Sequence, residues 1–452
     1  MSQSVTRGVI NNGIISIIQK IIRILDQLLL VPFFLTTWGA EYYGEWLTLS
    51  IIPSVLALAD LGFGSAGSNS FVLAYASGNK QKAADINKSS FFTISISILI
   101  GIVLTIIILI IGNKSHLFEK SLIPVSDAML AVTFIMAARL ISFYSQLIEG
   151  YFRSARKAAL GNLMISGQSA SNIVVGICIL MAGYKIVGYA ISLLIVSIIF
   201  NIIYFIIGKG LIDLKGFQGH ILKKDIKQIS TKGLGYMMNP IWQSLYFQGG
   251  TLVIRLTLGA ESVAIFNTVR TVCRSVNQLY SIINASIFPD LQYEYGRGNT
   301  QIVHRLFRIA VLFSMMIGII GSIFLTLFGN SLYQWWTKNL LIVPAPVWII
   351  FMFGVLFNAI WWTSVVSYRI TNQPYHFATI SIIATLISIS SSYFLSIHYG
   401  LTGATIGAIL FDIIMMFYVL PDSCHLLGMK TIDLFKHVKD DYHFLLKKIV
   451  HK

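Results

Sequence analysis

The chain has 452 residues, of which 56% are hydrophobic and only 11% are charged, and its mean hydropathy is +0.75. Soluble domains carry about 25% charged residues, so this composition excludes a soluble globular protein. The formal net charge is +15, and its meaning depends on where the basic residues lie along the chain.

Apolar runs long enough to cross a membrane recur along the whole chain. A transmembrane helix needs about 20 mostly apolar residues, and short polar stretches divide the runs. The sequence therefore predicts an all-α membrane protein of about twelve transmembrane helices. The predicted spans are residues 10–35, 43–74, 89–112, 125–150, 163–183, 187–208, 233–257, 262–287, 305–328, 346–368, 376–397 and 402–420.

The first apolar run lacks a small-x-small cleavage site, so we expect a retained helix rather than a signal peptide. With the N-terminus in the cytoplasm, segments on the cytoplasmic side hold 23 of the 33 lysines and arginines, and segments on the outer side hold 4. Basic residues favour the cytoplasmic side, which predicts that both termini are cytoplasmic. The positive charge then indicates contact with anionic lipid head groups, and not with nucleic acid.

Two amphipathic stretches, 209–230 and 431–449, lie outside the predicted spans and are expected along the cytoplasmic interface. The first divides the spans into two sets of six. The predicted domains are an N-terminal lobe at 1–208, an amphipathic linker at 209–232, a C-terminal lobe at 233–420 and a cytoplasmic tail with an amphipathic helix at 421–452.

The two halves repeat. The sequence Thr-Trp-Gly-Ala-Glu at 37–41 recurs as Thr-Leu-Gly-Ala-Glu at 257–261, and the stretch at 75–81 recurs at 295–301. Both pairs share an offset of 220 residues with no gap between them. This offset spans an even number of helices, so the halves have the same topology. Transporters built from such halves bind substrate between them and alternate access.

Charged and amide side chains form stripes on several predicted spans, where an unpaired charge would be costly. The stripe on the first span falls within an arc of about 120°, and the stripe on 262–287 within about 100°. These side chains are expected to line an aqueous cavity. The candidates are Lys20, Arg23, Asp26, Asp60, Arg139, Glu149, Asn239, Gln243, Arg255, Asn267, Arg270, Arg274 and Asn277.

Among the charges considered for a cavity, six are positive and four are negative, and the excess predicts an anionic substrate. The positive residues are Lys20, Arg23, Arg139, Arg255, Arg270 and Arg274, and the negative ones are Asp26, Asp60, Glu149 and Asp412. A planar guanidinium group binds phosphate oxygens in pairs, so Arg270 and Arg274, one turn apart, are candidate phosphate ligands. The alternative is internal pairing, in which Asp26 and Asp60 neutralise Arg23 and Arg270. Asp60 is also a candidate for coupling to a proton or a cation.

Neither a metal site nor an enzyme is predicted. Cys178, Cys273 and Cys424 are far apart, which favours apolar packing over metal binding. The chain shows no paired carboxylates, no Ser-His-Asp set and no phosphate-binding glycine loop. A polymerase or ligase that acts on lipid-linked sugars usually carries a long outer loop, whereas the longest outer connection here, at 329–345, has 17 residues.

Several motifs together resemble the polysaccharide-repeat (O-antigen) flippases, Wzx type, of the MOP exporter superfamily. They are Asp60-Leu61-Gly62-Phe63-Gly64-Ser65, Tyr75-Ala76-Ser77-Gly78-Asn79, the Gly-Ala-Glu turn, Glu149-Gly150-Tyr151-Phe152-Arg153 and Gly400-Leu401-Thr402-Gly403-Ala404. The resemblance implies two six-helix lobes of the MATE-like fold around a V-shaped cavity, working by alternating access.

The resemblance also implies a substrate, a polyprenyl (undecaprenyl) diphosphate that carries an oligosaccharide repeat unit. It would move from the cytoplasmic to the periplasmic leaflet of a bacterial inner membrane, for synthesis of O-antigen, lipopolysaccharide or a related surface polysaccharide. Related flippases bind the head group through basic residues of helices 1, 7 and 8, which correspond here to Lys20, Arg23, Arg255, Arg270 and Arg274. The basic residue that some relatives have on helix 2 is absent, and Glu45, Ser50 and Ser54 occupy that region.

The remaining expectations concern sugar contacts, coupling and partners. Trp361, Trp362 and Tyr368 are candidates for stacking on the sugar, with an interfacial aromatic belt as the alternative. No cofactor is expected apart from a coupling ion, proton or sodium, at Asp26 or Asp60. Partners besides substrate and membrane lipids would be polymerase or assembly proteins of the same pathway. The alternative function is export of organic cations by a multidrug exporter of the same superfamily, which needs unpaired carboxylates rather than excess arginine.

Overall fold

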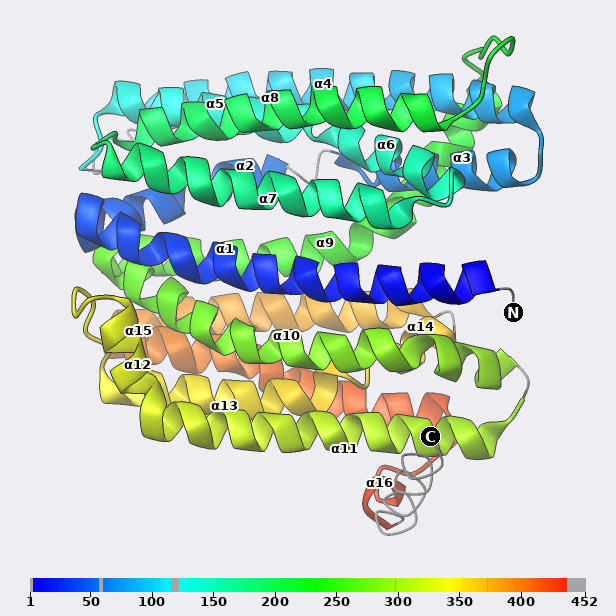
Figure 1. The fold of residues 1–452 in the computed structure, drawn as a ribbon. Coiled ribbons are helices and arrows are strands. Elements are labelled where there is room, and N and C mark those ends of the chain that lie inside the picture. Colours follow the sequence, from blue (N-terminus) through cyan, green and yellow to red (C-terminus); the bar gives the residue numbers. More distant parts are fainter. Residues whose placement is uncertain (1–2, 57–59, 115–121, 297, 372, 437–452) are drawn as a thin grey trace. The chain divides into compact units, whose positions relative to one another are not determined.

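The computed structural model describes residues 3–56, 60–114, 122–296, 298–371 and 373–436, and this part of the chain is helical with no strand. The chain divides into two compact units, unit 1 at 1–244 and unit 2 at 245–452. Figure 1 shows the helices of each unit running roughly side by side.

The helices of unit 1, in chain order, are α1 (Gln3–Leu49), α2 (Ile51–Leu56), α3 (Phe63–Ala76), α4 (Lys80–Lys114), α5 (Val125–Ile141), α6 (Phe143–Ser154), α7 (Ala158–Met181) and α8 (Ile186–Leu211). The division between the units falls inside α9 (Lys223–Leu258). Unit 2 continues with α10 (Ala260–Gly296), α11 (Thr300–Phe324), the π-helical turn η2 (Leu325–Gly329), α12 (Asn330–Trp336), α13 (Ala345–Trp362), α14 (Val366–Ile370), α15 (Pro374–Leu426) and α16 (Asp433–Lys436).

The predicted breaks between spans coincide with glycines inside two long helices. Gly39 interrupts α1 with φ 80° and ψ 168°, and Gly400 interrupts α15 with φ 57° and ψ −143°. These conformations suit glycine because it has no Cβ atom. Among the described residues, seven helical segments are long and apolar enough to cross a membrane, and the segment Tyr375–Leu426 contains two of the predicted spans. The predicted all-α membrane fold is confirmed.

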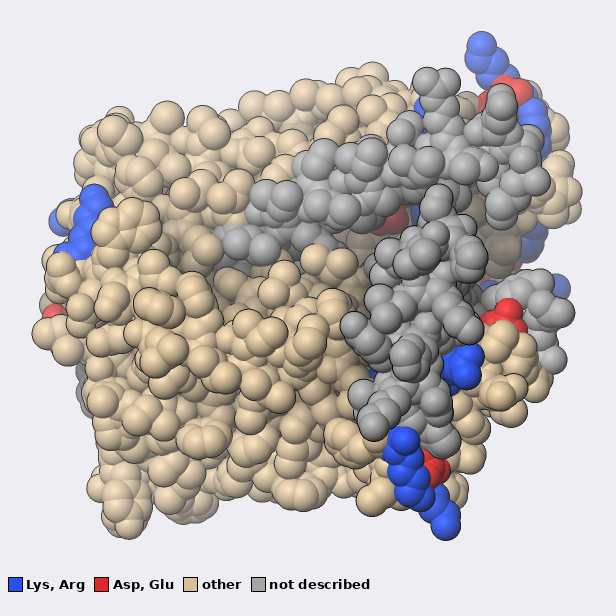
Figure 2. Space-filling view, turned by 60° about the horizontal axis from the view of Figure 1, so that its bottom comes forward, with Lys and Arg blue, Asp and Glu red and all other residues tan. Residues whose placement is uncertain are grey.

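The surface of the helices is apolar where a soluble protein would be polar. On α4, Leu99 and Val103 are 62% and 55% exposed, and α8 exposes Ile206 in the same way. On the face drawn in Figure 2, charged side chains gather at the helix ends and the surface between them is almost free of charge. This distribution fits helices that cross a bilayer, because lipid tails accept apolar side chains and exclude charged ones.

One core cluster of unit 1 is rich in aromatic side chains. In this unit α1 packs against α7, α5 packs against α8, and α3 packs against both α4 and α6. Tyr204 of α8 stacks between two rings, with centroid distances of 4.7 Å to Phe152 and 5.0 Å to Phe200. This cluster fixes α6 against α8 near the end where α8 leaves the apolar region.

In unit 2, long helices pack against one another in sequence. There α10 packs against α11, α11 against α13, and α13 against α15. Phe307 of α11, Val366 of α14 and Cys424 of α15 are buried in one apolar cluster. The predicted amphipathic helix of the tail is described only over α16, and residues 437–452 lie outside the described residues.

The internal repeat is present in the backbone. Gly39 and Gly259 have φ of 80° and 89°, and Gly78 and Gly298 have φ of 81° and 72°. After the second pair, the Asn79 side chain accepts a hydrogen bond from the Lys82 amide, as Asn299 does from the Ile302 amide. The two matched motifs therefore build the same turns and the same helix N-cap, 220 residues apart.

Candidate functional site

The best-defined polar site lies in unit 2, on the hairpin formed by α9 and α10. The turn at Gly259 reverses the chain, so residues at equal distances before and after it face each other. Thr251 and Asn267, each eight residues from the turn, lie 3.1 Å apart between Oγ1 and Oδ1. One turn further along, the same geometry brings Arg270 of α10 next to Phe247 of α9.

Arg270 is held in a fixed orientation by α9 and by its own helix. Nη1 donates to the Phe247 carbonyl oxygen at 3.2 Å, and Nη2 donates to Thr251 Oγ1 at 3.0 Å and to Asn267 Oδ1. Its guanidinium group lies 5.1 Å from the centroid of the Phe247 ring. These contacts orient the group without neutralising its charge, because none of the acceptors is ionised.

Arg274 lies one turn further along α10 and shares the same aromatic ring. Its guanidinium group is 4.4 Å from the Phe247 centroid, and its side chain is exposed, whereas Arg270 is half-buried. No acidic side chain among the described residues forms an ion pair with either arginine. Two adjacent guanidinium groups without an acidic partner in an apolar segment are candidate ligands for an anion, since guanidinium donors bind phosphate oxygens in pairs.

Amide side chains extend this polar face along α10. The buried Asn277 Oδ1 has no hydrogen-bond partner among the described protein atoms. Asn284 donates to the Trp362 carbonyl oxygen at 3.2 Å, while its own Oδ1 also lacks a partner. Buried polar atoms are usually satisfied, so these two oxygens are acceptors that can take a hydrogen bond from water or from a ligand hydroxyl.

Three further residues of α9 were predicted as site residues. Arg255 is half-buried, four residues beyond Thr251, and Gln243 is exposed within the part of α9 that belongs to unit 1. The side chain of Asn239 lies outside the described residues. The roles predicted for these three residues stay predictions.

In unit 1, α1 carries Lys20, Arg23 and Asp26, whose side chains all lie outside the described residues. Asp60 is buried, and its Oδ1 accepts a hydrogen bond from the Gly64 amide at 3.3 Å. A Cβ atom at Gly64 would lie 2.9 Å from the Cβ atom of Gln146, so glycine at this position lets α3 approach α6 closely beside Asp60.

The polar residues of α5 and α6 are spread over different contacts. Arg139 is exposed on α5. Gln146 of α6 accepts a hydrogen bond from the Ser65 hydroxyl group at 2.7 Å. Glu149 lies 3.7 Å from Arg153, which itself donates to Asn69 and thereby ties α6 to α3.

A second polar cluster in unit 2 was not predicted as a site. Asp412 of α15 is 9% exposed, and its Oδ1 accepts hydrogen bonds from Asn358 Nδ2 at 2.8 Å and from Trp361 Nε1 at 2.9 Å. No basic side chain among the described residues pairs with it. The sequence signal for this cluster was a single acidic residue, Asp412, within the last apolar span. Its partners on α13 could not be predicted, because they meet Asp412 only through helix packing.

The three aromatic candidates for sugar contact are mostly inside unit 2. Trp361 is fully buried beside Asp412, and Tyr368 is buried with its hydroxyl group donating to Asp422 at 2.6 Å. Trp362 is half-buried, and its ring centroid lies 5.3 Å from that of Trp361. A sugar would reach Trp361 or Tyr368 only after neighbouring side chains move, and the predicted stacking stays a prediction.

Comparison with known proteins places the chain in a family. The family model described as polysaccharide biosynthesis protein matches residues 9–292, more than half of the chain. The chain belongs to this family. No curated protein matches the sequence in a direct search.

Solved structures of membrane transporters share the fold. A multidrug resistance MATE family transporter of the MOP superfamily, in an inward-facing conformation, superposes with a TM-score of 0.71 at 17% identity, over 91% of this chain and 94% of that one. An outward-facing structure of such a transporter superposes with a TM-score of 0.65 at 16% identity, over 93% of this chain and 95% of that one. A third structure is a MOP superfamily transporter from Pyrococcus furiosus Vc1, for which reverse polarity of the binding pocket suggests a different function. It superposes with a TM-score of 0.61 at 16% identity, over 93% of this chain and 96% of that one. The chain therefore has the fold of these transporters, and its long apolar helices make it a multi-pass membrane protein.

Proposed function

We propose that this protein flips a polyprenyl (undecaprenyl) diphosphate-linked oligosaccharide from the cytoplasmic to the periplasmic leaflet of a bacterial inner membrane. The observation that carries the proposal is the arginine pair on α10. Arg270 and Arg274 share the Phe247 ring and have no acidic partner among the described residues. A lipid diphosphate supplies the two negative charges that such a pair lacks.

The two arginines have different tasks in this mechanism. Arg270 is already oriented by Phe247, Thr251 and Asn267, so it binds a phosphate with little further loss of side-chain freedom. Arg274 is exposed and held only by its ring contact among the interactions described above. It therefore meets the incoming diphosphate first and brings it to Arg270. In this proposal Lys20 and Arg23 of α1 add positive charge from unit 1, and Arg255 assists from α9.

Oxygen acceptors further along α10 suit the sugar part of the substrate. A sugar presents hydroxyl donors, and Asn277 Oδ1 and Asn284 Oδ1 lack donors. The polar face of α10 therefore offers guanidinium donors for the diphosphate and amide acceptors for the glycan. Binding at both regions would distinguish a glycan-carrying lipid from a bare polyprenyl diphosphate.

The membrane potential favours the proposed direction of transport. With a negative cytoplasm, each negative charge that moves outward gains about 2.3 kcal/mol per 100 mV. A diphosphate with two charges gains about twice that amount when it moves without a counter-ion. A proton or sodium ion at a buried carboxylate, Asp60 in unit 1 or Asp412 in unit 2, would return the empty carrier.

The setting follows from the substrate. The protein would work in the inner membrane with both termini in the cytoplasm, where lipid-linked repeat units are made. It would pass its product to a polymerase or another assembly protein of surface polysaccharide synthesis, and would itself catalyse no covalent step. Export of organic cations is the weaker alternative, because an uncompensated arginine pair repels a cationic substrate.

The test is the amount and sidedness of lipid-linked oligosaccharide in host cells with the gene intact, deleted, or carrying Arg270→Ala with Arg274→Ala. We expect repeat units to accumulate on the cytoplasmic leaflet in both altered strains. Ser50→Ala with Ser54→Ala is the matched control, since these positions correspond to the two arginines at the 220-residue offset. If deletion leaves the lipid-linked sugars unchanged and sensitises cells to cationic drugs, the flippase proposal is wrong.

A further inference from the structure

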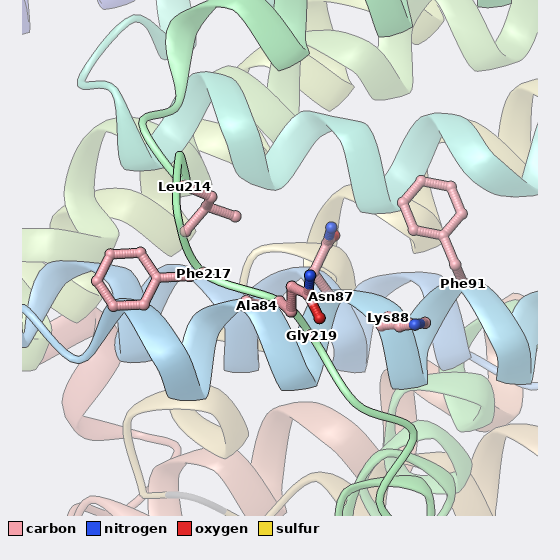
Figure 3. A pocket seen from close by; sticks show the side chains of 8 residues that line it. Ala84, Asn87, Lys88, Phe91, Leu214, Phe217 and Gly219 are labelled. Atoms are coloured by element: carbon pink, nitrogen blue, oxygen red, sulfur yellow. The ribbon is translucent and has the colours of Figure 1, made fainter.

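A groove of about 520 Å³ lies in unit 1, far along the chain from the arginine pair. One wall is a strip of α4 formed by Ala84, Asn87, Lys88 and Phe91, which share a face at helical spacing. The other wall is the α8–α9 connection (residues 212–222), which contributes Leu214 and Phe217. Figure 3 shows this connection crossing α4, with the labelled side chains along the crossing.

The α8–α9 connection is fastened to α4, so the groove has two fixed walls. The Asp85 carboxylate accepts hydrogen bonds from the His220 amide at 2.9 Å and from Gln81 Nε2 at 3.0 Å. Ser89 Oγ accepts a hydrogen bond from the Leu222 amide at 3.1 Å. The close crossing requires glycine at 219, because a Cβ atom there would overlap the carbonyl oxygen of Ala84.

Lys88 is the only charged residue among those that line the groove. Asp213 pairs with Lys80 at 2.7 Å, and Asp225 pairs with Lys82 at 2.5 Å. Lys88 is exposed and forms no ion pair among the described residues. Lys88 lines the groove, while the nearby Asp85 carboxylate accepts hydrogen bonds from the His220 amide and from Gln81.

A hydrogen-bond donor lies beside that charge. The Asn87 side chain takes part in one described hydrogen bond, in which its Oδ1 accepts from the Tyr151 hydroxyl group at 2.8 Å. This contact orients the amide and leaves Nδ2 as a donor. The groove thus combines an ammonium group and an amide donor with the apolar side chains of Phe91, Leu214 and Phe217.

The residues on either side of the groove indicate that it would lie near the level where lipid head groups meet acyl chains. Along α4, the residues after Lys88 expose Phe92, Ile96 and Leu99 to the surroundings, as expected inside the hydrocarbon region. On the α8–α9 connection, Phe217 and Ile221 are 41% and 46% exposed. The distribution of lysine and arginine predicts that this end faces the cytoplasm, where anionic lipids give the membrane surface a negative potential.

We propose that this groove binds one anionic diacyl phospholipid, with its phosphate on Lys88 and Asn87 and an acyl chain along Phe91, Leu214 and Phe217. The lipid would complete the contact between α4 and the α8–α9 connection. The site is separate from the substrate-binding arginines, and it does not depend on the proposed flippase function.

The test is native mass spectrometry of the full-length protein, released from detergent after addition of phosphatidylglycerol or phosphatidylcholine. We expect one phosphatidylglycerol to be retained by the wild type and phosphatidylcholine to be retained much less. Lys88→Gln should lower phosphatidylglycerol retention by about fivefold, the effect of about one surface lysine. Lys224→Gln is the matched control, since Lys224 is exposed near the connection but does not line the groove.

A second pair of variants tests the groove itself. Gly219→Ala should displace the connection and abolish retention, whereas Gly210→Ala should not, because a Cβ atom at Gly210 meets no atom within 4 Å. The proposal is wrong if Lys88→Gln behaves as the wild type or if phosphatidylcholine is retained equally. It is also wrong if inorganic phosphate at millimolar concentration displaces the lipid, since the groove would then be a site for soluble anions.

Discussion

Unit 1 and unit 2 share their turns but differ in the chemistry between them. The turns at Gly39 and Gly78 match those at Gly259 and Gly298 in φ to within about ten degrees. At the same 220-residue offset, Arg270 and Arg274 correspond to Ser50 and Ser54. Ser50 donates to the Trp46 carbonyl oxygen and Ser54 to the Ser50 carbonyl oxygen, each at 2.8 Å.

The difference suggests a division of roles, in which the turns set the architecture of the repeat and the proposed site between them sets the substrate. The glycine turns fix where each hairpin reverses, and this requirement is the same in both units. The serines satisfy their hydroxyl groups within their own segment, so this stretch of unit 1 offers no charge to a ligand. The arginines place two positive charges at the equivalent positions, and the proposed anion site therefore lies on this stretch of unit 2.

The largest effect on stability is expected at Asp412 in unit 2. Asp412→Ala leaves the donors of Asn358 and Trp361 buried without an acceptor, which should lower the free energy of unfolding by about 3 kcal/mol. Asp412→Asn keeps an acceptor oxygen and should cost less than half as much. Asp60→Ala in unit 1 removes one acceptor of a 3.3 Å bond and should also cost less. Thermal unfolding of the purified variants measures all three, and equal losses for the two alanine variants would contradict the assignment.

The next-largest effect is expected on transport, where lysine substitution should affect Arg270 more than Arg274. Arg270→Lys keeps the charge but loses the forked contacts to Phe247, Thr251 and Asn267. We expect transport of lipid-linked oligosaccharide in proteoliposomes to fall by about tenfold, equivalent to about 1.4 kcal/mol. Arg274→Lys should reduce it by only about twofold, because a lysine also binds over an aromatic ring. Equal effects of the two substitutions would show that Arg270 is not specially oriented.

Alanine substitution of the repeated turn glycines should lower thermal stability equally in both units. Alanine at Gly39 or Gly259 is forced into positive φ, which costs about 1 kcal/mol for a residue with a Cβ atom. Neither substitution causes a clash, since no atom lies within 4 Å of either Cβ position. The two variants should therefore lose similar thermal stability, and a much larger loss in one of them would mean that the repeated turns have different roles.

The smallest effect is expected at the exposed ion pair of the α8–α9 connection. The hydrogen bond from Lys80 holds the pKa of Asp213 below its usual value. The pair therefore contributes above the ordinary aspartate pKa of about 4, and its contribution is lost as the pH falls through the lowered value. Both partners are exposed, so Asp213→Asn should speed hydrogen exchange of residues 212–222 by no more than about twofold at pH 7.

Asp225 provides the contrast for that measurement. Its side chain is 1% exposed beside Lys82, so Asp225→Asn should speed exchange of the same residues clearly more than Asp213→Asn. The reverse order would mean that the connection is fastened mainly at Asp213.

The sequence predicted the elements of this fold well because the signals are local. Apolar run length gave the helices, and the repeated motifs located the glycine turns that the structure confirms. The stripe on 262–287 also placed Asn267, Arg270 and Arg274 on one face. The partner of that stripe, Phe247, could not be predicted, because an aromatic residue in an apolar span looks like any other lipid-facing or core residue.

Contacts between distant elements explain what else the sequence left open. Asp412 meets Asn358 and Trp361 only because α13 packs against α15. The amphipathic stretch 209–230 does not form a separate helix; residues 212–222 are non-helical, and α9 begins at Lys223. Gly216 has φ 81° there and Gly219 lies close to Ala84, and the apolar side chains of this stretch pack along α4 as well as facing outward.

The most direct test of the difference between the units is binding of a polyprenyl diphosphate to the purified protein. The variants are Arg270→Ala with Arg274→Ala in unit 2 and Ser50→Ala with Ser54→Ala in unit 1. We expect the arginine variant to bind at least about 100-fold more weakly, since losing charge-assisted contacts costs several kcal/mol, and the serine variant to bind as the wild type does. Unchanged binding by the arginine variant, or equal weakening of both, would contradict the assignment of the anion site to unit 2.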